Sequence, residues 1–204
     1  MANLSRLEEV VLVLAGLKNQ LEPCLRTFKR YRHDQESKSC LANYLLILVA
    51  SFLQEWQQLE RLGSSPEIRR TLIAAAPATR RIRAWRGISR ARSSMLAHGF
   101  RGKDGRLVNT TTLFGPDQVP TTFAGQLLLG EFAVYAIATA ICHHKAAADN
   151  ALSLLSTVWP DEEPDACGIN TMAEFEHEIA TLRGEIFAID PSLEHCFQGG
   201  RGRG

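Results

Sequence analysis

Apolar residues recur at spacings of three and four along most of this chain, and this period constrains its fold more than any other feature. A capping-box pattern, Ser5-x-x-Glu8, precedes the first periodic run. The apolar positions of that run are Leu7, Val10, Val11, Leu14, Leu17 and Leu21. Such residues share one face of an α-helix, so an amphipathic helix is expected to begin after Ser5. Pro23 is expected to kink or end it, with a continuation through Leu25 and Phe28 as the alternative.

The remaining helices are predicted from the same period and from cap and breaker residues at their ends. They are expected from Leu41 to Gly63 after a polar connector at 33–39, from Pro66 to about Pro77, from Thr79 to Gly99, from Thr122 towards Trp159, and from Thr171 through Ile186. Asn150 is a candidate interruption of the long helix after Thr122. Between Gly99 and Pro120 the pattern breaks, and Asp104-Gly105 is a turn dipeptide typical of a small hairpin.

These patterns predict an all-α fold, an antiparallel helical bundle of four to five main helices with an irregular loop after the basic helix. The 204-residue length suits a single domain, expected over residues 1–197, and the Gly/Arg tail at 198–204 is expected to be disordered. No internal repeat is apparent.

Several features favour a soluble cytoplasmic protein with no membrane partner. The longest apolar run, Leu41 to Leu53, has thirteen residues, which is too short to cross a bilayer. The five cysteines are odd in number and form no C-x-x-C pair, so reduced thiols are expected. The N-terminus lacks the basic flank and apolar core of a secretory signal.

Charge is strongly polarised along the chain. The segment from Arg69 to Arg106 holds eleven basic residues and one acid, Asp104, so it carries about +10 while the rest of the chain sums to about −9. Such a segment is suited to a polyanionic partner. Histidine is the side chain that exchanges protons near neutral pH, and His98 lies within this segment. Chemistry on nucleic acid is therefore the first functional hypothesis.

Arg92 is the unusual residue of the basic helix. On a continuous helix at about 100° per residue, it falls near the middle of an apolar arc that includes Trp85, Ile88 and Met95. A charge in that position is costly unless it is paired or opens into a cavity. Two readings follow: a buried ion pair with a carboxylate such as Glu55 or Glu131, or an arginine that binds phosphate in a cleft.

His98 follows Arg92 by six residues, which places it about 120° round and about 9 Å along the same helix. The two side chains meet only if the helix loosens at Gly99, if Arg92 extends, or if a second copy of the chain supplies half of the site. A separation of six residues therefore favours a site that two copies of the chain share. A simpler role for His98, an interaction with the C-terminal end of the helix dipole, stays open.

The segment from Arg92 to His98, followed by Gly99 and a charged loop, resembles the HEPN superfamily. These are all-α proteins of toxin–antitoxin, abortive-infection and other RNA-targeting systems, and their signature is an Arg four to six residues before a His. The resemblance implies metal-independent RNA cleavage without a cofactor, in which the 2′-hydroxyl attacks the adjacent phosphorus. It assigns proton transfer to His98 and phosphate stabilisation to Arg92. It also implies a homodimer, in a phage-defence or toxin–antitoxin system, with a nucleotidyltransferase-like antitoxin as a candidate partner.

Further residues near this motif are candidates for RNA contact. Arg90, Arg101 and Lys103 could hold phosphates, and Ser93 could assist by hydrogen bonding, although solvated surface side chains are the plainer reading. The alternative function is a non-catalytic helical interaction protein that binds RNA, a nucleotide or a protein partner. The run Cys142-His143-His144 is not expected to hold a metal, because adjacent helical residues diverge by about 100° unless the helix unwinds.

Overall fold

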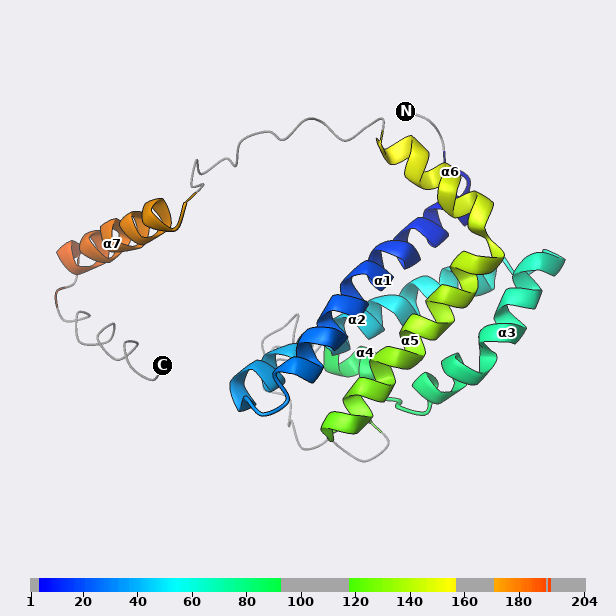
Figure 1. The fold of residues 1–204 in the computed structure, drawn as a ribbon, viewed down its shortest axis with the longest axis horizontal. Helices are drawn as coiled ribbons and strands as arrows, with labels where there is room; N and C mark the ends of the chain where they lie inside the picture. The colour runs from blue at the N-terminus through cyan, green and yellow to red at the C-terminus, as the bar shows by residue number, and fades with distance from the viewer. Residues whose placement is uncertain (1–3, 93–117, 157–170, 190, 192–204) are drawn as a thin grey trace. The chain divides into compact units, whose positions relative to one another are not determined.

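The computed structural model describes residues 4–92, 118–156, 171–189 and 191, and these residues form an all-α fold (Figure 1). The chain divides into two compact units, residues 1–158 and 159–204. The helices of the first unit are α1 (Arg6–Arg30), α2 (Gln35–Arg61), α3 (Pro66–Arg83), α4 (Ile88–Ala91), α5 (Phe123–His143) and α6 (Lys145–Ser156). The second unit contains α7 (Met172–Ile189). The predicted all-α class is confirmed.

Other parts of the sequence-based organisation stay predictions. The single domain over residues 1–197 is one of these. The loop after the basic helix, with its Asp104-Gly105 hairpin, and the Gly/Arg tail at 198–204 lie outside the described residues. In the second unit, the predicted capping box at the start of α7 is confirmed. Thr171 N–H donates to Glu174 Oε2 at 2.8 Å, and Glu174 N–H donates to Thr171 Oγ1 at 3.2 Å.

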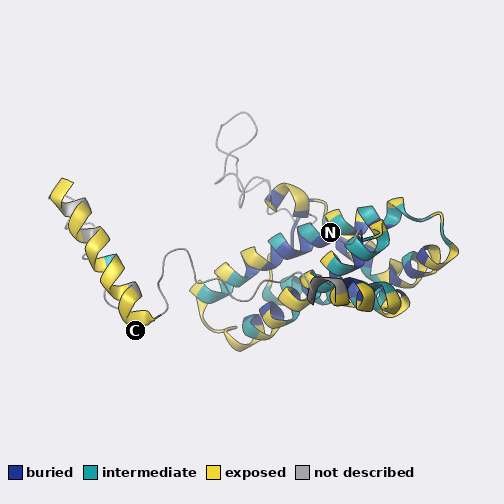
Figure 2. Cartoon of the chain, turned by 90° about the horizontal axis from the view of Figure 1, so that it is seen from above, coloured by how far each residue is buried: buried dark blue, intermediate teal, exposed yellow. Residues whose placement is uncertain are grey.

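The core of the first unit lies between α1, α2 and α5, and α3 packs along α5. Figure 2 shows the buried residues on the helix sides that face the interior of this bundle. Phe28 packs edge-on against Phe123 with ring centroids 4.7 Å apart, and Phe52 lies beside Trp56 at 5.4 Å. Burying one such aromatic side chain contributes on the order of 1.5–3 kcal/mol, so these rings are major contributors to the free energy of folding.

Side-chain interactions account for both the start of α1 and its continuation beyond Pro23. Ser5 and Glu8 make the predicted reciprocal capping box. Pro23 lies inside the helix, which runs on to Arg30. Leu25 and Phe28 are buried beyond the proline, at 3% and 0% exposure. Their burial offsets the loss of one backbone hydrogen bond, so the continuation through Leu25 and Phe28 is the correct alternative.

α2 begins earlier than the polar connector at 33–39 predicts. Asp34 caps it, because its carboxylate accepts hydrogen bonds from the backbone N–H groups of Glu36 and Ser37. The connector is therefore confined to the residues between Arg30 and Gln35. Two described helices, α2 and α5, have the length and apolar character that a membrane span would need, and both also contribute buried residues to the core.

The basic segment differs most from its prediction. α3 runs unbroken through Pro77 and Thr79, where an end and a new start were expected, and it ends at Arg83. Thr79 is buried and its hydroxyl donates to the carbonyl of Ala75 instead of capping a helix. The chain then turns before the short helix α4. The continuous helix from Thr79 to Gly99 is therefore wrong.

Gly87 explains the turn. Its N–H donates to the carbonyl of Gln118 at 2.7 Å, and a Cβ placed on Gly87 would lie 2.8 Å from that same carbonyl oxygen. This close approach requires a residue without a side chain. The backbone therefore turns to follow a hydrogen bond from a distant part of the chain, and α4 begins directly after Gly87.

Candidate functional site

Arg92 follows α4 directly and is exposed, whereas the sequence placed it on a buried apolar arc. That arc assumed a continuous helix, and the turn at Gly87 changes the direction in which Arg92 projects. Its Nη1 donates a hydrogen bond to Gln54 Oε1 of α2 at 3.4 Å. Glu131, one of the two proposed ion-pair partners, binds Lys29 Nζ at 2.7 Å instead.

Glu55, the other proposed partner, makes no ion pair with Arg92 within the described residues. Burial, the largest influence, raises the pKa of Glu55, and the nearby Glu9 adds to this while Arg6 opposes it. The buried Arg92–carboxylate pair is thus absent from the part of the chain that the structure describes. The guanidinium keeps most of its donors for other partners.

Arg92 lines an open cavity of about 220 Å³. Its other lining residues come from α2 and α4: Ala50, Leu53, Gln54, Gln57 and Ser89. Two amide groups, one hydroxyl and one guanidinium thus converge on this cavity. Such groups can donate hydrogen bonds to phosphate oxygens, and the guanidinium can do so in bidentate fashion. The phosphate-binding reading of Arg92 is chemically compatible with this setting.

The other residues of the predicted site divide into two groups. Arg90 is described, and its side chain is exposed on α4. His98, Ser93, Arg101 and Lys103 lie outside the described residues. The pairing of Arg92 with His98 therefore stays a prediction.

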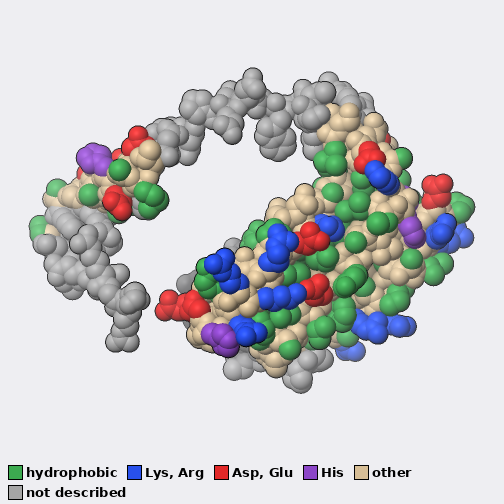
Figure 3. Space-filling view, viewed as in Figure 1, with side chains coloured by type: hydrophobic (Ala, Val, Ile, Leu, Met, Phe, Trp, Pro, Cys, Tyr) green, Lys and Arg blue, Asp and Glu red, His purple; other side chains and the backbone are tan. Residues whose placement is uncertain are grey.

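Arginines continue along α3 and α4, and Figure 3 shows basic side chains along the edge that α3 forms. Arg83 binds both carboxylate oxygens of Glu60, at 2.7 and 2.8 Å. Arg81 donates to the Pro77 carbonyl and lies over the ring of Phe132, 5.9 Å from its centroid. Between Pro66 and Ala91, the arginines that are exposed and make no ion pair with another described residue are Arg69, Arg70, Arg80, Arg81, Arg86 and Arg90. This surface is therefore positively charged, as the sequence predicted.

A second cluster lies at the junction of α5 and α6. Thr71 of α3 is fully buried, and its Oγ1 lies 3.0 Å from His143 Nδ1 and 2.9 Å from His144 Nε2. Adjacent histidines were expected to diverge unless the helix unwound, and here it does unwind. His144 has φ −114° and ψ 36°, which ends α5 and turns both imidazoles towards one hydroxyl. The interruption predicted at Asn150 therefore occurs at His144, and Asn150 lies within α6.

The two histidines differ in environment. His144 is buried, with 5% exposure, and burial lowers its pKa from the ordinary value of 6.5. The neighbouring His143 lowers this pKa further, while Glu67 opposes the change. His144 is accordingly neutral at pH 7. His143 is exposed and reaches solvent.

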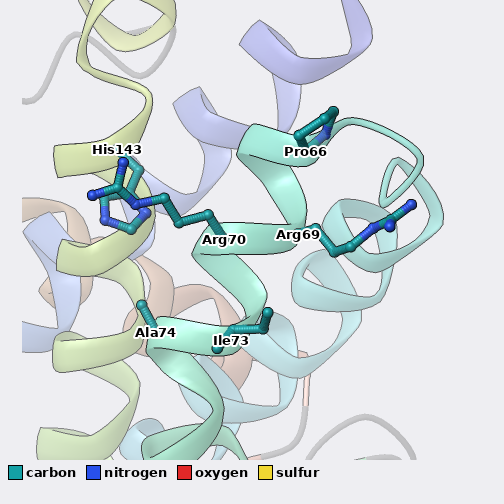
Figure 4. Close-up of a pocket in the computed structure, with 6 residues that line it drawn as sticks. All are labelled: Pro66, Arg69, Arg70, Ile73, Ala74 and His143. Atoms are coloured by element: carbon teal, nitrogen blue, oxygen red, sulfur yellow. The ribbon is translucent and has the colours of Figure 1, made fainter.

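His143 also lines an open cavity of about 510 Å³ between α3 and α5 (Figure 4). The other lining residues are Pro66, Arg69, Arg70, Ile73 and Ala74. Sequence reasoning missed this cavity, because no local spacing links His143 to residues about seventy positions earlier. The adjacent pairs Arg69-Arg70 and His143-His144 are the one signal that could have drawn attention to it.

No group of three or more His, Cys, Asp or Glu side chains that could hold a metal ion occurs within the described residues. Comparison with protein-family models, curated proteins and solved structures finds no match for this chain. The function is therefore inferred from the residues themselves.

Proposed function

We propose that this protein is a metal-independent endoribonuclease in which Arg92 binds the reacting phosphate and His98 transfers protons. The observation that carries the proposal is the setting of Arg92, whose guanidinium has no carboxylate partner among the described residues and lines an open cavity with amide and hydroxyl groups. The all-α fold and the positively charged α3–α4 surface support it. The Arg-x5-His spacing supplies the catalytic pair.

In the proposed reaction, the 2′-hydroxyl oxygen attacks the adjacent phosphorus, and the bond from phosphorus to the 5′-oxygen breaks. The attacking hydroxyl loses its proton to a base and the leaving 5′-oxygen gains one. The products are a 2′,3′-cyclic phosphate and a 5′-hydroxyl. His98 serves as general base or general acid, and Arg92 stabilises the charge that develops on the non-bridging oxygens.

We further propose how the enzyme assembles, which residues bind RNA and where the enzyme acts. Two copies of the chain would form a homodimer that brings one protomer's Arg92 near its partner's His98. Arg90, Ser93, Arg101 and Lys103 would bind the RNA backbone. The protein would act in the cytoplasm, in a toxin–antitoxin or phage-defence system, with a nucleotidyltransferase-like antitoxin as a candidate partner.

The test is cleavage of mixed RNA in EDTA, with chemical analysis of the new ends. The wild type is expected to produce 2′,3′-cyclic phosphates, and Arg92→Ala and His98→Ala are each expected to abolish them. Arg86→Ala is the matched control, because Arg86 is an exposed arginine outside the proposed site. Intact RNA with wild-type protein, or cleavage that survives both substitutions, would reject the site.

A non-catalytic RNA-binding protein is the second candidate. The observation that favours it is the set of exposed arginines on α3, on α4 and in the turn between them that have no carboxylate partner in the described chain. Such a surface binds phosphates without needing His98. Saturable RNA binding with no cleavage by wild-type protein would support this candidate over the enzyme.

A further inference from the structure

The cavity lined by Arg70 and His143, here called the Arg70 pocket, contains a histidine whose ring is fixed from behind. Thr71 Oγ1 lies 3.0 Å from His143 Nδ1, so the opposite edge of the ring, with Nε2, is left for other partners. Thr71 is fully buried and is itself bound to His144 Nε2. His143 is therefore an exposed imidazole with a fixed orientation.

The hydrogen bonds of this cluster meet at the Thr71 hydroxyl. That hydroxyl donates to the carbonyl of Glu67 at 3.1 Å, and its oxygen can accept from His144 Nε2–H and His143 Nδ1–H, at 2.9 and 3.0 Å. The Nε2 atom of His143 then faces away from Thr71. When the His143 ring is protonated, this Nε2 also carries a hydrogen. This arrangement provides a hydrogen-bond donor for an anion.

Arg70 supplies the positive charge. Figure 4 shows its side chain extending from α3 towards His143, while Arg69 projects to the other side of the helix. Both guanidiniums are exposed and make no ion pair or hydrogen bond with another described residue. Arg70 therefore keeps its planar pair of donors, which matches two oxygens of a phosphate.

Most of the remaining lining of the Arg70 pocket is apolar, and the pocket is of suitable size. Pro66, Ile73 and Ala74 line it together with Arg69, and Ile73 is 71% exposed. Its volume of about 510 Å³ falls within the usual range for small-molecule sites. A sugar or base ring could cover these apolar side chains while its phosphate meets Arg70 and His143.

The Arg70 pocket is separate from the cavity at Arg92. From Arg70 to the end of α3 at Arg83 is about 20 Å along the helix axis. The cavity at Arg92 lies beyond that end, between α2 and α4. The two cavities share no lining residue.

We propose that the Arg70 pocket binds the terminal phosphate of a nucleotide, with Arg70 and His143 Nε2 on the phosphate oxygens and the apolar side chains under the nucleoside. The phosphate belongs either to a free nucleotide or to the 5′ end of an RNA. The site does not depend on the proposed ribonuclease activity.

The test is calorimetric titration of the full chain with adenosine 5′-monophosphate, with adenosine as the ligand that lacks the phosphate. Wild-type protein is expected to bind the monophosphate saturably and adenosine at least about 10-fold more weakly. Arg70→Ala is expected to weaken binding by about 10-fold or more, and His143→Ala by about 3-fold or more, since a charge-assisted hydrogen bond is lost in each. All substituted side chains are exposed, and urea unfolding verifies that each variant is folded.

Two matched controls separate this site from general charge effects and from the ribonuclease proposal. Arg80→Ala removes an exposed charge of the same helix that does not line the Arg70 pocket, and it should change the affinity by less than about 2-fold. Arg92→Ala should bind the monophosphate like the wild type even if RNA cleavage is lost. An equal loss in the Arg80 and Arg70 variants, or no saturable binding by wild-type protein, would overturn the proposal.

A competition experiment identifies the source of the phosphate. A short RNA with a 5′-phosphate that displaces the monophosphate, while its 5′-hydroxyl counterpart does not, indicates an RNA end. Failure of both RNAs to displace it indicates a free nucleotide. Displacement by the two RNAs with equal affinity would overturn the assignment of a terminal phosphate.

Discussion

Replacing Thr71 by Val tests the buried contact that orients both histidines. Valine has nearly the same volume and helix propensity as threonine, so the change removes a hydroxyl without opening a cavity. His144 Nε2, 2.9 Å from that hydroxyl in a buried environment, would lose its partner. His143 is exposed and can bond to water instead. The expected loss of unfolding free energy is about 1–3 kcal/mol, the usual cost of one unsatisfied buried polar group.

Thr79→Val is the matched control on the same helix. Thr79 is also buried, but among the described residues its hydroxyl bonds to the carbonyls of Ala75 and Ala76 alone, at 3.3 and 3.5 Å. No side chain depends on that hydroxyl, so the change should be within about 0.5 kcal/mol. Urea unfolding at pH 7.5, with equal m-values, measures both differences. Equal losses for the two variants would refute the role given to the Thr71 hydroxyl.

Three further results are expected. Because burial lowers the pKa of His144 below 6.5, the contribution of this residue to stability is fully present above pH 6.5 and is lost as the pH falls through the lowered pKa. The urea midpoint should therefore decline more between pH 8 and pH 5 in wild type than in His144→Gln, and parallel declines would contradict this. Burial, with a smaller effect from the neighbouring thiol of Cys40, raises the pKa of Cys24 to about 11. An alkylating reagent should therefore modify Cys24 far more slowly than the exposed Cys40 and Cys142, which peptide mapping would measure, and comparable rates would be inconsistent with the burial of Cys24. Gly87→Ala should lower the free energy of unfolding by about 1–3 kcal/mol, because the new methyl group would lie 2.8 Å from the backbone oxygen of Gln118. Gly16→Ala is the control, because a methyl group there meets nothing within 4 Å and should raise the free energy of unfolding by up to about 1 kcal/mol. The reverse order of stabilities would be evidence against the tight turn.

Local patterns predicted those parts of the fold that local interactions determine. The all-α class, the start of α1 and the cap of α7 each depend on residues within four positions of one another, such as Ser5 and Glu8. The core positions of α1 follow from the same short period. The burial of Leu25 and Phe28 beyond Pro23 depends on the rest of the bundle, so the sequence left two alternatives there.

Breaks in helices could not be predicted in the same way. α3 ends at Arg83, and in the turn that follows, Gly87 bonds to Gln118, a residue about thirty positions later. α5 ends at His144, where two imidazoles meet a hydroxyl from α3. The apolar arc around Arg92 assumed an unbroken helix, so the predicted burial of Arg92 was wrong. The choice of Arg92 as a candidate site residue stays a prediction.

The catalytic role proposed for Arg92 is tested most directly by measuring the single-turnover cleavage rate and the RNA affinity of Arg92→Lys side by side. Lysine keeps the charge but cannot form the two parallel hydrogen bonds that a guanidinium makes with the reacting phosphate. If Arg92 stabilises charge that develops during cleavage, the rate should fall by about 100-fold or more while the dissociation constant changes by less than about 3-fold. An unchanged rate, or a loss of rate that only follows a loss of affinity, would contradict the role proposed for Arg92.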